Sequence, residues 1–221
     1  MISVNSMRAR LREATTAAHE RLHRHPGFAA AAAGEIAIAD YRLLLARLYG
    51  FHRAFEITQA AVRDPAKDAE GRTRAWLIVE DLETLGVERE EIDRLPLCEA
   101  LAPLDSEAET LGALYVLEGS TLGGIQIARA LEPVLREYEG RGRRFYHGYG
   151  DRHGAMWRAF LARLEPLAAR PSEAEAAVRS AIRTFESFEL WMRGWRSAFP
   201  ALEKASRNRR HNAPKNLAIE T

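Results

Sequence analysis

The chain has 221 residues, of which 47% are hydrophobic and 29% charged, a size and balance typical of a soluble globular protein with one sizeable domain. The net charge of +1 argues against a dedicated nucleic-acid binder. The sequence has no apolar run long enough to span a membrane, no secretory signal pattern and a single cysteine, Cys98, which excludes an internal disulfide and a cysteine-based metal cluster. We therefore expect a cytoplasmic protein in which Cys98 is a small core residue.

Helical periodicity of apolar residues extends along most of the chain, with no strand-like alternation of useful length. The pattern predicts helices over residues 7–24, 36–62, 70–86, 106–137, 151–168 and 172–199. His25-Pro26-Gly27 stops the first of them. Two helix starts have capping-box spacing: Ser106 with Glu109, and Ser172 with Glu175. Short loops and the absence of a linker predict one all-α domain over residues 1–203, followed by a basic flexible tail over 204–221.

One predicted helix contains an unusual number of glycines. The stretch "LYVLEGSTLGGIQIARAL", residues 114–131, includes Gly119, Gly123 and Gly124. Each glycine inside a helix costs roughly 1 kcal/mol relative to alanine. Gly112, Gly119 and Gly123 are separated by seven and four residues, so they fall near one face, with Gly124 beside them. A face without side chains admits either a closely packed helix or a flat ligand, and the spacing leaves both open.

The first predicted helix offers groups that would hold a flat porphyrin. It contains "LREATTAAHERLH", in which His19 follows Arg12 by seven residues. That spacing puts both side chains on one side, with a rise of about 10.5 Å between them. A neutral imidazole at His19 can bind iron, and a guanidinium at Arg12 can reach a carboxylate at the porphyrin edge. Taken singly, His19 also fits a surface histidine and Arg12 a solvated charge.

Together the two segments resemble the heme oxygenase family, in which an axial histidine follows a Leu-basic-Glu-Ala-Thr run and glycines let a later helix bend across the haem. Their order and the all-α background match over most of residues 7–199. The resemblance implies an all-α bundle with haem between a proximal helix and a kinked distal helix. It also implies the family's reaction, in which haem b is both cofactor and substrate. O2 and electrons convert it to biliverdin, CO and Fe2+, as in the bacterial biliverdin-producing enzymes.

The resemblance further implies partners and site residues. The chain has no dinucleotide-binding fingerprint, so the electrons would come from a ferredoxin or a flavoprotein reductase, and a protein that accepts biliverdin is a further possible partner. His19 matches the axial iron ligand and Arg12 a contact to a haem propionate. The remaining matches are the distal glycines Gly119, Gly123 and Gly124, a second propionate contact at Arg158 with Arg163 as its rival, pocket walls at Phe185 and Phe188, and flanking positions at Tyr115 and Gln126.

Two positions depart from the family pattern. Mammalian members carry an aspartate one residue after the first distal glycine, where this chain has Ser120. A serine can hold a water but supplies no carboxylate, although Thr121 and nearby backbone groups are possible substitutes. His23, four residues after His19, is an alternative iron ligand. Ser120 therefore keeps open a second function, that of a haem carrier or sensor that does not open the ring.

Other classes fit the sequence less well. A ferritin-like di-iron protein needs two Glu-x-x-His motifs, and the chain has one, Glu20 to His23. A related helical fold serves thiamine-degrading enzymes, which need a cysteine nucleophile, and Cys98 has no evident acidic partners. A helical interaction module without a cofactor would leave the glycines and the spacing of His19 and Arg12 as coincidences.

Overall fold

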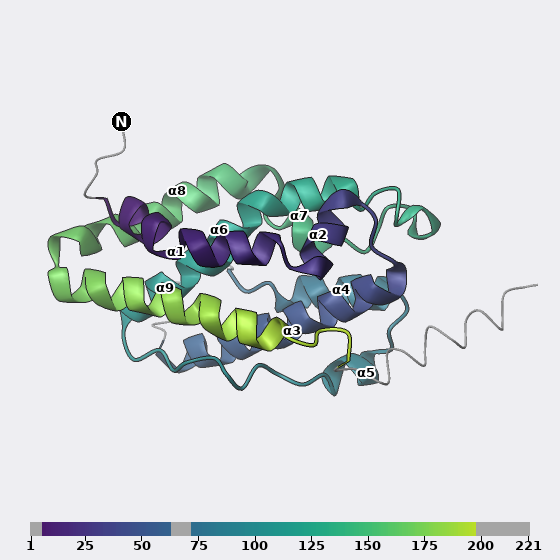
Figure 1. Ribbon diagram of the computed structural model, residues 1–221, viewed down its shortest axis with the longest axis horizontal. Coiled ribbons are helices and arrows are strands. Elements are labelled where there is room, and N and C mark those ends of the chain that lie inside the picture. The colour runs from purple at the N-terminus through teal and green to yellow at the C-terminus, as the bar shows by residue number, and fades with distance from the viewer. Residues whose placement is uncertain (1–5, 63–71, 198–221) are drawn as a thin grey trace, which may run out of the picture.

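The structure is a computed structural model that describes residues 6–62 and 72–197. Its helices, in chain order, are α1 (Met7–His23), α2 (Pro26–Ala33), α3 (Ile38–Val62), α4 (Ala75–Thr84), α5 (Arg89–Asp93), α6 (Glu107–Ala130), η2 (Arg136–Tyr138), α7 (Arg144–His147), η3 (Gly150–Arg152), α8 (His153–Leu164), η4 (Glu165–Ala169) and α9 (Pro171–Met192). They gather into one elongated bundle in which α1 lies beside α9 (Figure 1). The described ranges contain no strand, so the predicted all-α class is confirmed. None of their helices is both long and apolar enough to cross a membrane.

The stop signal after the first helix is also the start of a helix that the sequence analysis missed. α1 ends at His23, and Pro26 occupies the first turn of α2. A proline is tolerated there because the N–H groups of a first turn have no partner within the helix. The His25 ring caps this helix by accepting a hydrogen bond from the Gly27 N–H at 3.2 Å. Gly34 ends α2 in the left-handed region, with φ of 69°.

Three predicted helices are too long, and prolines explain two of the differences. α6 ends at Ala130 rather than residue 137, and α8 ends at Leu164 rather than residue 168. Pro133 and Pro166 follow these ends, and a proline has no N–H to donate to the carbonyl four residues earlier, so the α-helical pattern stops. Beyond Leu164 the chain continues as the 3-10 helix η4. The third, α9, stops at Met192 rather than residue 199.

The two predicted capping boxes have different outcomes. Ser106 caps α6, with its hydroxyl accepting from the Glu109 N–H at 3.2 Å. Ser172 does not cap α9, because that helix begins at Pro171 with no side-chain cap. The fixed φ of Pro171 starts the helix in place of a capping serine. The predicted tail, 204–221, and the start of the predicted helix 70–86 lie outside the described residues.

The buried apolar side chains form two clusters. One joins α2, α4, α5 and α7, and the other joins α1, α8 and α9 and includes the buried Cys98, as expected. Helix α3 contributes to both. Helix α6 also contributes to both, through residues up to Leu117 on one side and from Ile127 on the other. Residues 118–126 of α6, which carry the three glycines, belong to neither cluster.

The glycines of α6 fall into two kinds. At Gly112 a Cβ atom would clash with the carbonyl oxygen of Ala177 on α9, and at Gly124 it would lie 2.8 Å from the carbonyl oxygen of Tyr146 on α7. These two glycines permit close packing. At Gly119 and Gly123 a Cβ atom would meet nothing within 4 Å, so these two face open space.

A buried polar network holds the middle of α6 on its packed side, away from the open glycines. The carboxylate of Glu118 accepts the Tyr149 hydroxyl at 2.8 Å and pairs with Arg72 at 3.0 Å. Arg74 donates to the carbonyl oxygen of Leu117 at 2.7 Å. Charged groups at this depth are stable only when paired and hydrogen-bonded, so the network fixes the position of α6 against the chain on either side of it.

Asp81 of α4 holds the start of α7. Its carboxylate accepts the backbone N–H groups of Arg144 and Phe145 at 2.8 and 2.9 Å. Burial raises the pKa of Asp81 from 3.8 to about 6, and the two N–H donors only partly oppose this rise. The folded chain therefore binds a proton at Asp81 more tightly than the unfolded chain does.

The two kinds of glycine predict opposite effects of alanine on stability. Gly112→Ala should lower the free energy of unfolding by about 1–3 kcal/mol, because α6 and α9 must move apart. Gly119→Ala should raise it by up to roughly 1 kcal/mol, because alanine favours the helix and meets no neighbour. Urea denaturation of the two variants and the wild type measures both changes. Shifts of the same sign would contradict the assignment.

The Asp81 environment predicts a pH-dependent effect of Asp81→Asn. Between about pH 4 and 6 the folded wild type holds the extra proton, so the Asp81 contribution to stability falls as the pH rises through this window. The asparagine variant lacks this titration and should gain stability relative to the wild type from pH 4 to 6.5. Urea midpoints at several pH values test this, and a constant difference would show that Asp81 has an ordinary pKa.

Candidate functional site

Helices α1 and α6 run in the same direction. At their N-terminal ends both are attached to the junction of α8 and η4: Arg163 pairs with Glu107 at 3.9 Å, and Glu165 accepts the backbone N–H of Met7 at 3.0 Å. At the other end, Gly34, which closes the short helix after α1, lies against the carbonyl oxygen of Ala130, the last residue of α6.

Tyr115 of α6 lies near α1, because Arg8, Arg12 and Thr15 of α1 all act on its hydroxyl. The Thr15 hydroxyl itself donates to the Leu11 carbonyl oxygen at 2.7 Å. Burial raises the pKa of Tyr115, and the two cationic neighbours and Thr15 only reduce that rise. One turn beyond Thr15 is His19, and one turn beyond Tyr115 is Gly119. The predicted iron ligand and the first distal glycine thus each lie one turn beyond the residues through which α1 and α6 approach each other.

The face of α6 around Gly119 is open and apolar. Gly119 and Gly123 have nothing within 4 Å of a Cβ position, and Leu122 is 46% exposed, unusual for a leucine on a packed helix. The hydroxyls of Ser120 and Thr121 donate to carbonyl oxygens of α6 itself, three residues earlier, each at 2.7 Å. Such bonds bend helices, although α6 remains helical throughout.

His19 is exposed on α1 with its ring edge towards Phe185 of α9, 6.5 Å between centroids at 87°. Its Nε2 lies 3.3 Å from Nε2 of His23. Partial burial lowers the pKa of His19, the charge of His23 lowers it further, and Glu20 opposes them. The imidazole is therefore neutral at pH 7 and able to bind a metal through a ring nitrogen.

The other predicted site residues are only partly brought together. Phe185 contacts His19, whereas Phe188 packs against Phe51, 4.7 Å between centroids, at the boundary of the two apolar clusters. Gly124 packs closely against α7, because the chain of Tyr146 passes directly over it, and its predicted role as a distal glycine stays a prediction. Gln126 is exposed two turns beyond Gly119.

The two arginine candidates on α8 differ in what they contact. Arg163 is engaged with Glu107 at 3.9 Å. Arg158 is exposed, with its guanidinium 3.3 Å from the Cβ position of Gly154, one turn earlier. On α1, Arg12 is exposed and forms no ion pair with a described residue. Arg12 and Arg158 are thus available to an anionic ligand, whereas Arg163 is already paired.

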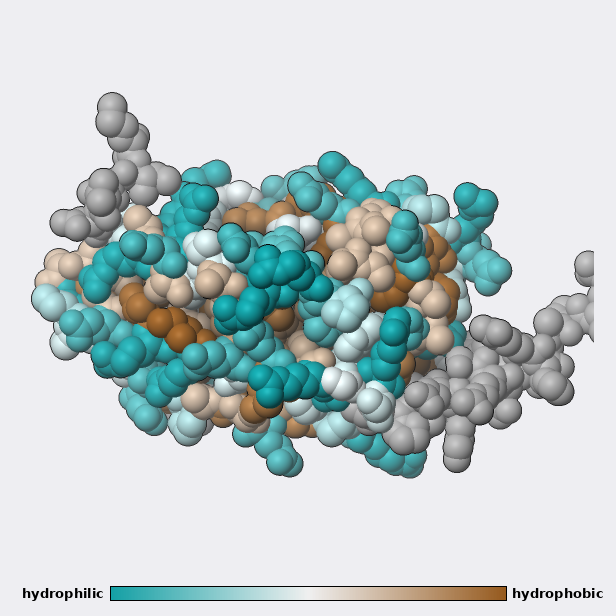
Figure 2. All heavy atoms as spheres, in the orientation of Figure 1, coloured by the Kyte–Doolittle hydropathy of each residue, from teal (hydrophilic) through white to brown (hydrophobic). Residues whose placement is uncertain are grey.

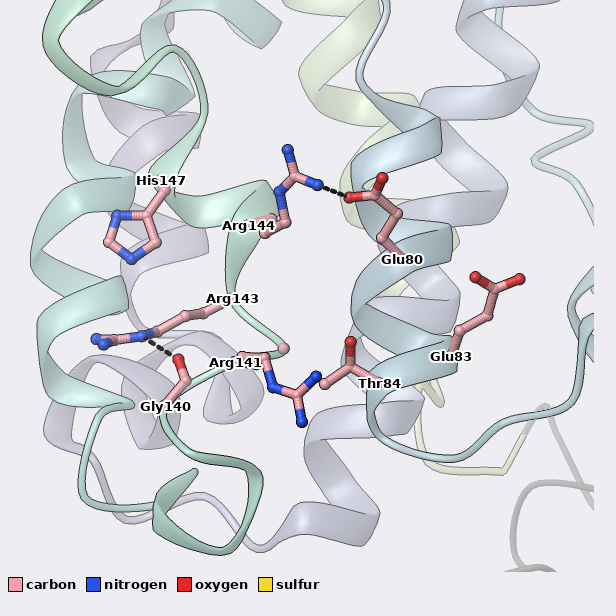
Figure 3. Close-up of a pocket in the computed structure, with 9 residues that line it drawn as sticks. Glu80, Glu83, Thr84, Gly140, Arg141, Arg143, Arg144 and His147 are labelled. Atoms are coloured by element: carbon pink, nitrogen blue, oxygen red, sulfur yellow. Dashed lines mark hydrogen bonds and ion pairs between the residues drawn. The ribbon is translucent and has the colours of Figure 1, made fainter.

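A hollow elsewhere on the surface is lined by none of the predicted site residues. It has a volume of about 490 Å³ and lies between α4 and the loop before α7 (Figure 3). Its charges are balanced: Arg144 pairs with Glu80, and Arg143 donates to the Gly140 carbonyl oxygen at 2.8 Å. A second hollow of about 420 Å³, beside Arg47 and Trp191, also contains none of the predicted residues.

No group of three or more histidine, cysteine, aspartate or glutamate side chains is placed to hold a metal ion within the described ranges. A di-iron centre of the ferritin type needs such a group, so that part of the chain does not form one. An iron that enters already bound by a porphyrin needs only one protein ligand, which His19 fits.

The sequence analysis missed the polar network behind the open glycines. Glu118 immediately precedes Gly119, yet it is 2% exposed and paired with Arg72 away from the open face. A signal was present, because Glu118 interrupts the apolar run "LYVLEG". Its partners Arg72 and Tyr149 are distant in sequence and carry no pattern that would reveal them.

The face seen in Figure 2 is mostly hydrophilic with apolar patches between the hydrophilic side chains, as expected of a bundle whose helices each bury one side.

A comparison with curated proteins gave no match. A comparison with family models gave one, to heme oxygenase, over residues 5–194. That match covers α1 to α9 and thus every predicted site residue. Together with the parallel α1 and α6 and the open glycine face, it shows that the chain belongs to the heme oxygenase family, whose substrate is haem.

Proposed function

We propose that this protein binds haem between α1 and α6 and opens its ring to biliverdin, CO and Fe2+, with O2 and electrons from a partner protein. The observation that carries this proposal is the open face of α6 at Gly119 and Gly123, in a chain that matches the heme oxygenase family. His19 of α1 would provide a neutral imidazole and this face a surface without side chains, which are the two sides that a flat iron porphyrin requires.

His19 is proposed as the axial ligand of the haem iron. The Phe185 edge restricts rotation of its ring, and its lowered pKa keeps a nitrogen lone pair free at neutral pH. His23 must give up its contact with Nε2 of His19 when the iron binds there, or bind through its own nitrogen instead. Bound haem supplies the iron at which O2 is reduced, and the protein supplies position and access.

Cationic groups near the groove are proposed to bind the haem propionates. Arg12 lies two turns before His19, is exposed and has no carboxylate partner among the described residues. Tyr115, whose pKa is raised by burial and lowered in part by the charge of Arg12, provides a hydroxyl nearby. Arg158 is the second proposed contact. Since the propionates set the rotation of the haem, these residues would also decide which meso carbon faces Gly119.

On the distal side, Gly119 and Gly123 are proposed to leave room for O2 and to let the α6 backbone approach it. The Ser120 oxygen retains lone pairs that can hold a water, although its hydrogen is donated to the Leu117 carbonyl oxygen.

We further propose that the protein works in the cytoplasm, as the bacterial enzymes do. A ferredoxin or flavoprotein reductase would donate the electrons, and another protein would accept the biliverdin.

One observation favours a second function, haem carriage or sensing. The carboxylate nearest to Gly119 in the sequence, that of Glu118, points into the buried network and away from the open face. Of the side chains next to Gly119, only Ser120 is exposed, and its hydroxyl proton is already donated to the helix. A protein that bound haem here without delivering protons would hold it unchanged.

An optical titration of the haem-free protein with hemin, followed by a reductant and air in the presence of catalase, separates these functions. We expect saturable one-to-one binding, then loss of the haem spectrum as biliverdin and CO form. Binding without ring opening would establish the carrier or sensor.

His19→Ala should weaken hemin binding at least tenfold and change the haem spectrum, because the imidazole ligand is lost. His147→Ala, an exposed histidine on α7, is the control, and an unchanged spectrum of His19→Ala would exclude His19 as the ligand.

The open face predicts that Gly123→Leu blocks function while preserving the fold. A leucine side chain meets no neighbour at this position, but it would occupy the space assigned to haem and O2. We expect an unfolding free energy at least equal to that of the wild type and hemin affinity or turnover reduced more than tenfold. Ala162→Leu on the exposed side of α8 is the matched control. Normal turnover by Gly123→Leu would show that the ligand lies elsewhere.

A further inference from the structure

The residues that follow the proposed iron ligand form a pattern with a second chemical meaning. Residues 19–23 read His-Glu-Arg-Leu-His, two histidines four apart on one face of a helix with a glutamate after the first. Histidines with this spacing bind zinc in helices of metalloenzymes. We propose that His19 and His23 chelate a divalent transition-metal ion of the zinc class in the haem-free protein, and that this ion and haem exclude each other.

The geometry of the two imidazoles suits one shared ion. Their Nε2 atoms are 3.3 Å apart, and both rings are exposed on α1. Zinc binds imidazole nitrogen at about 2.0–2.1 Å with tetrahedral angles, which separates two ligand nitrogens by about 3.3–3.4 Å. An ion can therefore take the place of the hydrogen bond between the rings without a change in the backbone of α1.

The charges around the pair favour a cation. Glu20 acts on His19 electrostatically, with the sign that favours positive charge there. Arg21 lies between the two histidines in sequence, but its guanidinium is held by Glu189 of α9 at 2.9 Å. The positive charge of Arg21 is thus turned towards α9 and balanced by Glu189.

The same pair is not a hydrolytic zinc site. Catalytic zinc is held by three protein ligands, and no third histidine, cysteine, aspartate or glutamate joins the pair among the residues described. Water would complete the coordination, so the ion would exchange freely. The exclusion of haem rests on the proposed function, because it requires Nε2 of His19 to bind haem iron, whereas the chelate itself does not.

Calorimetric titration of the haem-free, full-length protein with zinc sulfate tests the chelate. We expect one ion per chain, with affinity reduced at least tenfold by His19→Gln or His23→Gln, because two ligands become one. His147→Gln, which changes an exposed histidine outside the pair, should bind as the wild type does. Circular dichroism confirms that each variant is folded. Equal zinc affinity of the wild type and His23→Gln would overturn the site.

Hemin titrations with and without zinc test the exclusion. Zinc should raise the hemin concentration needed for half-saturation of the wild type, and this effect should disappear in His23→Gln, which keeps His19. Zinc binding without any effect on hemin would overturn the exclusion and leave the chelate. If hemin binds independently of His19, the proposed function fails, whereas the zinc titration still decides the chelate on its own.

Discussion

The carboxylate of Glu118 is the anchor on which the site depends. It is buried to 2% exposure in the middle of α6, where an unpaired charge would be very unfavourable, and Arg72 and Tyr149 satisfy both its oxygens. Because these groups come from other parts of the fold, they hold the middle of α6 in place. The face of α6 at Gly119 and Gly123 can therefore remain without packing contacts.

The glycines show how one residue type serves two purposes on one helix. Gly112 brings α6 against the backbone of α9, and Gly124 brings it against α7. Between these two contacts, Gly119 and Gly123 touch nothing outside their own helix. The apolar core is divided at the same place, so the segment that borders the proposed haem site is positioned by packing at its ends and by polar groups in its middle.

Much of this arrangement follows from local sequence signals. The helical period gave the all-α class, and the seven-residue spacing of Arg12 and His19 placed both on one side of α1. The role of Gly124 was not accessible, because glycine spacing does not reveal that the chain of Tyr146 crosses above it. Pro26 was interpreted as a stop although it also begins α2, since a proline signal ends one helix and starts another equally well. The role of Glu118 follows only from its partners Arg72 and Tyr149, which are distant in the sequence.

The position of Cys98 has a consequence for the proposed reaction with oxygen and reducing equivalents. The thiol is buried, and this burial raises its pKa, although the backbone N–H groups of Ala100 and Leu101 partly oppose the rise. The thiolate is the form that oxidants attack, and here it is both scarce and shielded from solvent. Cys98 is the only cysteine of the chain, so we expect the protein to resist thiol oxidation and disulfide-linked dimerisation. Oxidative damage during the proposed turnover would then fall on other side chains.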